Sequence, residues 1–160
     1  MIRPVILSDA RAICDIYNYY VLNTIVTFEE EAVMPEEMEL RIAEITAKFP
    51  WLVYEDAGQV KGFAYAGPWK SRCAYRYSSE CTVYLENGYA AKGIGSILYE
   101  ALLAQLPSGI HSVIGGIALP NEASVALHEK FGFEKVAHFK EVGYKQNQWI
   151  DVGYWEKIFS

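Results

Sequence analysis

"ENGYAAKGIGSILYEALLAQL", residues 86–106, is the stretch that decides the fold. It combines a glycine pair, Gly93 and Gly95, with apolar residues at helical spacing. The predicted buried stripe of this helix consists of Ile94, Ile97, Leu98, Ala101, Leu102 and Leu106. A glycine inside a helix costs about 1 kcal/mol relative to alanine, so two glycines at a helix start need an explanation. We infer that some group approaches this backbone so closely that a side chain would obstruct it.

A phosphate group fits the start of this helix. The first N–H groups of a helix lack intrahelical partners, and the helix dipole makes that end positive. The sequence "KGIGS" suits this use, with Lys92 as an added cation, although a plain strand-to-helix turn is the alternative. It is neither a Walker A loop nor a dinucleotide fingerprint, because the required further residues are missing.

A strand is predicted directly before this turn, from Ala74 to Glu86, and it carries a carboxylate, Glu80. Alternation along a strand places Glu80 on one face and Cys81 on the other. A carboxylate within an apolar strand is costly unless it has a partner or a task. Glu80 is therefore a candidate catalytic group, with a solvent-facing strand residue as the alternative.

The composition predicts one globular domain over residues 1–160. Of the 160 residues 52% are hydrophobic and 21% are charged, and the net charge of −6 argues against nucleic acid or an anionic membrane as a partner. No apolar run reaches the roughly 18 residues of a membrane span. The three cysteines lack metal-ligand spacing, so we expect reduced thiols, no metal and a cytoplasmic protein.

The remaining segments predict a mixed sheet with helices. Strands are expected at 2–5, 51–56, 59–69 and 111–118, with two more around a turn at 145–148, and helices from Asp9 to Leu22, at 34–49 and at 120–133. The order is βαα, then βββ, then αβαββ. This is the α+β (mixed α/β) class, with the sheet flanked by helices.

Several segments together resemble a known family. The glycine turn between a strand and a helix, followed by "PNEASVALHEKFGF", resembles the GNAT N-acetyltransferases. The stretches "AGPWKSRCAYRYSSECTVYL" and "GYKQNQWIDVGYW" resemble its phosphinothricin acetyltransferase subgroup, which includes acetyltransferases of methionine sulfoximine and methionine sulfone. The resemblance covers essentially the whole chain. It implies the GNAT fold, a twisted mixed sheet of about seven strands with about four helices, and a homodimer.

The resemblance also implies acetyl-CoA as the acetyl donor. In GNAT proteins the glycine turn binds the pyrophosphate, the preceding strand pairs with the pantetheine arm, and an asparagine at the next helix contacts the cofactor. The corresponding residues are Lys92, Gly93, Ile94, Gly95 and Ser96 for the turn, Val83, Tyr84 and Leu85 for the strand, and Asn121, itself a predicted N-cap. Ala90 departs from the usual Gln or Arg, which removes one side-chain contact.

Two residues are implied to be catalytic. Glu80 matches the glutamate that acts as general base and takes the proton of the amine. His128 stands where many GNAT enzymes have a tyrosine near the departing sulfur, and it could protonate the CoA thiolate or help take the amine proton. The alternative for His128 is a structural histidine on a helix.

The resemblance implies four residues that bind the acceptor. Arg72 could pair with a carboxylate or phosphinate, while Lys70, Tyr75 and Phe28 are further candidates. The alternatives are a solvated basic loop for the two cations and core packing for Phe28. Gln146 and Ile150 depart from the histidines of the herbicide-resistance enzymes.

The predicted function is direct transfer of an acetyl group from acetyl-CoA to the α-amino group of a small amino acid or analogue. Two alternatives remain open. The acceptor could be a polyamine, an antibiotic or a protein amino terminus, for which "FEEEAVMPEE" could supply an acidic pocket. The protein could also be a non-catalytic acyl-CoA sensor, which only the Ala90 departure favours.

Overall fold

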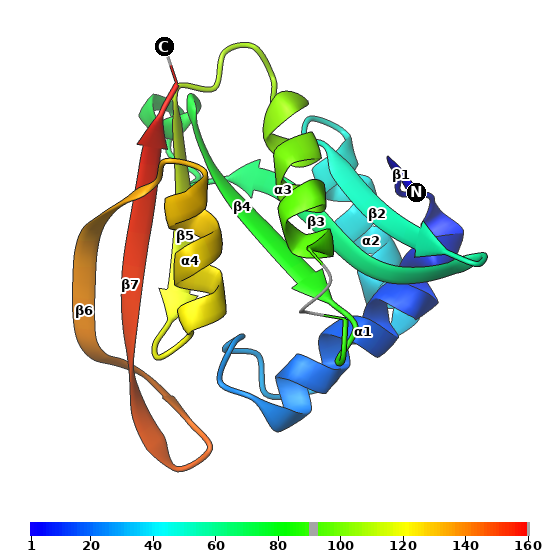
Figure 1. Ribbon diagram of the computed structural model, residues 1–160, viewed down its shortest axis with the longest axis horizontal. Helices are drawn as coiled ribbons and strands as arrows, with labels where there is room; N and C mark the ends of the chain where they lie inside the picture. Colours follow the sequence, from blue (N-terminus) through cyan, green and yellow to red (C-terminus); the bar gives the residue numbers. More distant parts are fainter. Residues whose placement is uncertain (90–92, 160) are drawn as a thin grey trace. The chain divides into compact units, whose positions relative to one another are not determined.

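Seven strands and four α-helices alternate along the described part of the chain, residues 1–89 and 93–159 of a computed structural model (Figure 1). They are β1 (Ile2–Pro4), α1 (Ala10–Asn23), α2 (Pro35–Thr46), β2 (Trp51–Asp56), β3 (Gln59–Pro68), β4 (Ser78–Leu85), α3 (Ile94–Ala104), β5 (Ser112–Ala118), α4 (Glu122–Lys130), β6 (Glu134–Lys145) and β7 (Gln148–Ile158). Hydrogen bonds link the strands in the order β1-β2-β3-β4-β5-β7-β6. The chain forms two compact units, and β4 contributes to both.

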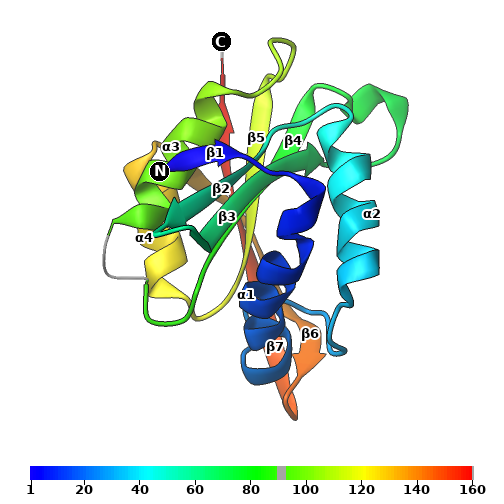
Figure 2. The same cartoon turned by 90° about the vertical axis from the view of Figure 1, so that its right-hand side faces the viewer.

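The first unit comprises Met1–Tyr19, Ala32–Gly67 and Cys81–Ser108. Its strands β1, β2 and β3 pair antiparallel, and a tight turn with positive φ at Ala57 and Gly58 joins β2 to β3. Helices α1 and α2 lie on one side of these strands and α3 lies on the other (Figure 2). The core between them is apolar and includes Ile13, Ile42, Leu52, Val53, Phe63, Leu98, Tyr99 and Leu102.

The second unit comprises Tyr20–Glu31, Pro68–Glu80 and the chain from Gly109 onward. Its central strand β5 runs parallel to the first residues of β4 and antiparallel to β7, which pairs in turn with β6. Helix α4 lies along β5 (Figure 1). The β6–β7 turn has positive φ at Gln146 and Asn147, where the sequence predicts it. The buried side chains include Val113, Ile114, Phe133, Ile150 and Trp155.

The predicted mixed α/β class and the predicted element order are confirmed. No helix within the described ranges is long and apolar enough to cross a membrane. The single domain over residues 1–160 stays a prediction.

Several local predictions are wrong. Leu106, expected in the stripe of the glycine helix, lies beyond its last residue, Ala104, and the helix expected at 34–49 ends at Thr46. The strand does not begin at Ala74 but at Ser78, because a short 3₁₀ turn occupies Cys73–Tyr75, where every side chain is exposed and no strand face is buried. In α3, Ile97 is 50% exposed, whereas Tyr99 is fully buried. Both flank the central stripe of Ile94, Leu98 and Leu102, and hydrophobicity alone does not tell which flank the sheet covers.

Candidate functional site

Glu80 lies on β4 at the position where the strand leaves β5. Ser79 and Cys81, its neighbours, are buried on the opposite face, as alternation predicts, while Glu80 itself is half-buried. The parallel pairing of β4 with β5 runs from Ser78 to Glu80, which faces Ile114. The strand therefore presents one carboxylate on the face away from Cys81.

The surroundings of Glu80 favour its protonated form. Burial raises the pKa of the Glu80 carboxyl above its ordinary value, and the positive charge of Lys70 opposes this rise. Lys70 itself is exposed, with its ammonium 4.8 Å from the centre of the Trp69 ring. A carboxylate with a raised pKa accepts a proton more readily near neutral pH, which is the property a general base needs.

Sequence reasoning missed two residues near Glu80, Gly116 and Tyr154, and a third, Phe139, that contacts Tyr154. Tyr154 lies directly opposite Gly116 in the β5–β7 pair. Its ring makes edge-to-face contacts with Trp69, at 5.5 Å between centroids, and with Phe139, at 5.8 Å. The sequence carries no signal for this cluster, because the register of β5 against β7 decides which residues meet.

The predicted phosphate turn belongs to the first unit. Gly93 is the N-cap of α3 and has a φ of +76°, a left-handed conformation that favours glycine. A β-carbon at Gly93 would meet no atom of the described residues within 4 Å. Ile94, Gly95 and Ser96 form the first turn of α3, the end of a helix toward which its backbone N–H groups point. The prediction for Lys92, and the departure at Ala90, lie outside the described residues.

The predicted pantetheine strand is the second half of β4. Val83, Tyr84 and Leu85 are half-buried there. The Tyr84 ring packs edge-on against Tyr17 of α1, at 5.2 Å between centroids, and also contacts Phe63 of β3 at 5.6 Å. These contacts hold this half of β4 against the core of the first unit.

Asn121 is the N-cap of α4, as predicted, and its side-chain oxygen accepts a hydrogen bond from the Ser124 N–H at 3.1 Å. His128, on the same helix, is only 5% exposed. Its Nδ1 donates to the Ser124 carbonyl at 2.8 Å. Its Nε2 lies so close to β5 that a β-carbon at Gly115 would overlap it.

This placement weakens one of the two predicted roles of His128. Burial lowers the pKa of the imidazole, and the hydrogen bond to Ser124 only partly opposes this. With the hydrogen on Nδ1, the neutral ring leaves Nε2 unprotonated, so it is a poor proton donor for a thiolate. A catalytic role for His128 stays a prediction, and its observed contacts are those of a packed helix residue.

The four predicted acceptor residues lie in three places. Lys70 acts on Glu80 through its charge, whereas Arg72 and Tyr75 lie on the exposed turn before β4. Phe28 lies on the segment after α1, 44% exposed, with its ring where a side chain of Gly143 would otherwise be. Sequence reasoning missed Lys145, whose buried ammonium donates to the Thr27 carbonyl at 2.7 Å and so holds this segment.

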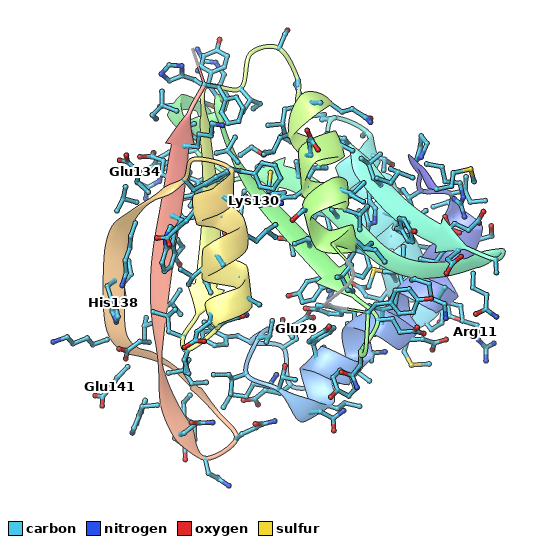
Figure 3. The ribbon with its side chains drawn as sticks, viewed as in Figure 1. Arg11, Glu29, Lys130, Glu134, His138 and Glu141 are labelled. Carbon is cyan, nitrogen blue, oxygen red and sulfur yellow. The ribbon has the colours of Figure 1, made fainter. Side chains whose placement is uncertain are left out.

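Two features of the structure do not belong to this site. A cavity of about 220 Å³ in the first unit contains none of the predicted site residues; its lining is Tyr17, Met38, Arg41, Glu44, Ile45, Trp51, Phe63 and Tyr65. His138 and Glu141 lie along β6 (Figure 3), where His138 pairs with Asp151 at 2.8 Å. Among the described residues, no group of three or more His, Cys, Asp or Glu could hold a metal ion.

Comparison with known proteins identifies the family. The profile of the acetyltransferase (GNAT) domain matches residues 2–153. A phosphinothricin N-acetyltransferase of Streptomyces viridochromogenes is 42% identical over 160 residues, which cover 99% of this chain and 87% of the relative. An L-methionine sulfoximine/L-methionine sulfone acetyltransferase of Salmonella typhimurium is 34% identical over 150 residues, which cover 91% of this chain and 86% of the relative.

A solved structure agrees with these sequence relatives. The GNAT superfamily phosphinothricin acetyltransferase of Sinorhizobium meliloti, determined in complex with acetyl-CoA, has a TM-score of 0.94 and is 32% identical; the match covers all of this chain and 88% of that one. The chain therefore belongs to the GNAT acetyltransferase family. The predicted fold and the predicted class of enzyme, an acetyltransferase, are confirmed.

Proposed function

We propose that the protein transfers the acetyl group of acetyl-CoA to the α-amino group of a small amino acid or analogue of the phosphinothricin, methionine sulfoximine or methionine sulfone type. The single observation that carries this proposal is Glu80, a half-buried carboxylate whose pKa burial raises. The relatives that cover nearly the whole chain have acceptors of this type in their names.

Glu80 removes the proton that keeps an amino group unreactive near neutral pH. The amino group arrives mostly as an ammonium, and Glu80 takes its proton directly or through one water. The free amine then attacks the thioester carbon, the new C–N bond forms and the C–S bond breaks. The protonated Glu80 returns its proton to the departing thiolate of CoA, directly or through water, and the amide nitrogen releases its second proton to solvent. No covalent enzyme intermediate is needed, and Cys81 is buried on the face opposite Glu80.

The donor is proposed to be held mainly by backbone groups. The first turn of α3, from Gly93 to Ser96, offers N–H groups to the pyrophosphate, because a helix N-terminus attracts anions. The Val83–Leu85 part of β4 offers its backbone to the pantetheine arm, and Asn121 contributes at the start of α4. The acetyl-CoA found in the Sinorhizobium meliloti structure supports this choice of donor.

The acceptor is proposed to be recognised by charge and by an aromatic contact. Lys70 and Arg72 are exposed cations that suit a carboxylate or phosphinate group. Phe28 and Tyr75, both partly exposed, suit the apolar part of the acceptor side chain. We include a homodimer and a cytoplasmic location in the same proposal, and light scattering of the purified protein tests the dimer.

The test is release of free CoA from acetyl-CoA with phosphinothricin, methionine sulfoximine, methionine sulfone or spermidine, against a blank without acceptor. We expect turnover with at least one of the first three, and a loss of about a hundred- to ten-thousand-fold in Glu80→Gln, with acetyl-CoA binding retained. The matched control is Glu86→Gln, which removes a carboxylate paired with Lys61 at 3.0 Å just after the same strand and should leave turnover unchanged. Turnover with spermidine alone, or equal turnover in Glu80→Gln, would refute the proposal.

A further inference from the structure

Gly116 is the exposed residue of an otherwise buried strand. Every other residue of β5, from Ser112 to Ala118, is buried. A β-carbon added at Gly116 would lie 3.0 Å from Tyr154 Cε1 and 3.6 Å from Glu80 Oε2. The missing side chain therefore leaves room that the Tyr154 ring and the Glu80 carboxylate both approach.

Two aromatic rings hold the Tyr154 ring in this place. Trp69 and Phe139 contact it edge-to-face, with interplanar angles of 78° and 79°. The Glu80 carboxylate lies close enough to Tyr154 to add to the rise that burial causes in the pKa of the Tyr154 hydroxyl. The phenol thus stays neutral beside the carboxylate.

We propose that Tyr154 is a positioning residue for Glu80: its ring, seated over Gly116, excludes water from one side of the carboxylate and so keeps Glu80 a stronger base. This inference rests on the proposed role of Glu80 as general base. The physical reason is that water stabilises a carboxylate anion, so a better hydrated Glu80 holds its negative charge more easily and accepts a proton less readily.

The titratable groups that face Glu80 in the described part of the chain are few. Lys70 approaches from the loop after β3 and Tyr154 from β7, while β5 offers the side-chain-free Gly116. On β4 itself the neighbours on the same face, Ser78 and Thr82, carry no titratable group. Of the two, only Lys70 carries a charge near neutral pH, so the pKa of Glu80 depends on that cation and on how far its surroundings exclude water.

A tyrosine over a glycine is also an ordinary packing device in a sheet, and the experiment must separate the two roles. Loss of packing lowers stability but leaves the titration of Glu80 unchanged. Loss of water exclusion lowers the pH midpoint of Glu80 toward its ordinary value of 4.5. The midpoint is therefore the readout that decides.

The experiment is an NMR titration of the carboxyl carbons of protein labelled at glutamate, in which the Glu80 signal is the one that Glu80→Gln removes. We expect a midpoint above 4.5 in the wild type, nearly the same midpoint in Tyr154→Phe, which keeps the ring, and a lower one in Tyr154→Ala. The matched control is Tyr144→Ala, which removes a tyrosine of the same hairpin that packs on Trp149, and it should not move the midpoint.

A second variant keeps the test decisive if Tyr154→Ala does not fold. Phe139→Leu removes an exposed ring that contacts Tyr154, so it should loosen Tyr154 and lower the midpoint by a smaller amount. A folded Tyr154→Ala with the wild-type midpoint would overturn the proposal, and so would Tyr154→Phe falling as far as Tyr154→Ala. If Tyr154→Ala is unfolded, an unchanged midpoint in Phe139→Leu overturns it.

Activity supplies an independent check. In Tyr154→Ala the acidic limb of the pH profile of kcat/KM should move to lower pH, and the plateau should fall, but by less than in Glu80→Gln, because a weaker base still works. The NMR titration needs no turnover. A protein that releases no CoA with any acceptor would refute the proposed function, whereas the effect of Tyr154 on Glu80 could still be read.

Discussion

Lys145 holds the segment that carries Phe28, and its removal should weaken acceptor binding specifically. The side chain is 5% exposed, and its ammonium donates to the Thr27 carbonyl at 2.7 Å and to the Tyr20 carbonyl at 3.5 Å. Burial lowers the pKa of Lys145, while the carboxylates of Glu30 and Glu29 oppose this. We choose Lys145→Met as the perturbation, because it keeps the apolar stem and removes only the charged donor.

The magnitude follows from the two hydrogen bonds. A bond to a charged donor contributes about 1.5–3 kcal/mol, and the 3.5 Å contact adds little because it is long. Relief of the buried ammonium offsets part of the loss, so we expect a net cost of about 1–2 kcal/mol. If the segment from Tyr20 to Glu31 bears this cost alone, acceptor binding weakens by up to about 5- to 30-fold.

The assay compares the KM for the acceptor with the Kd for acetyl-CoA in the same variant. We expect the KM to rise and the Kd to stay within about twofold, since the Thr27 bond lies within the second unit and the α3 turn lies in the first. The matched control is Lys157→Met. Lys157 donates to the Phe131 carbonyl at 2.8 Å in the same unit, but far along the chain from Phe28. An unchanged acceptor KM in Lys145→Met, or an equal rise in Lys157→Met, would refute the reasoning.

Two further predictions concern stability and donor binding. Because the folded state lowers the pKa of His128, the unfolded state binds more protons, and His128 should reduce stability as the pH falls below 6.5. Urea unfolding measured over a range of pH should show this dependence in the wild type and lose it in His128→Gln. The same dependence of unfolding free energy on pH in both proteins would contradict the prediction. Gly93→Ala should weaken acetyl-CoA binding roughly tenfold. The control is Gly58→Ala at a glycine with the same φ of +76°: both variants should lose about 1 kcal/mol of stability, but Gly58→Ala should not change the Kd. Equal effects of both variants on the Kd would refute a special role for Gly93.

The sequence predicts well whatever depends on local pattern. The order of strands and helices, the turn at Gln146 and the N-cap at Asn121 all follow from residue types at fixed spacing. The separation of Glu80 from Cys81 follows from alternation along one strand. The early start of the β4 prediction was wrong because tyrosines favour strands and also occur in exposed turns, and pattern alone does not show that nothing covers them.

The sequence does not predict contacts that depend on strand register or on residues far apart along the chain. Gly116 and Tyr154 are separated by many residues and meet only because β5 pairs with β7 in one register. Lys145 looks like a turn residue, and only the path of the segment after α1 makes it a buried donor to Thr27. No spacing rule connects such residues, so the environment of Glu80 could not be predicted, although its place on the strand face away from Cys81 could.

Two titratable groups of the second unit, the buried His128 and the half-buried Glu80, act on stability in opposite directions, and the difference supports a functional role for one of them. His128 has a lowered pKa, so its burial costs stability only below pH 6.5 and nothing at neutral pH. Glu80 has a raised pKa, so its burial costs stability as the pH rises above its ordinary value of 4.5, and the cost persists at neutral pH. A buried neutral histidine therefore costs no stability near neutral pH, whereas a half-buried carboxylate lowers the stability of the protein at that pH. Such a penalty is typical of sites where a shifted pKa performs a reaction, which favours Glu80 over His128 as the group that moves the proton.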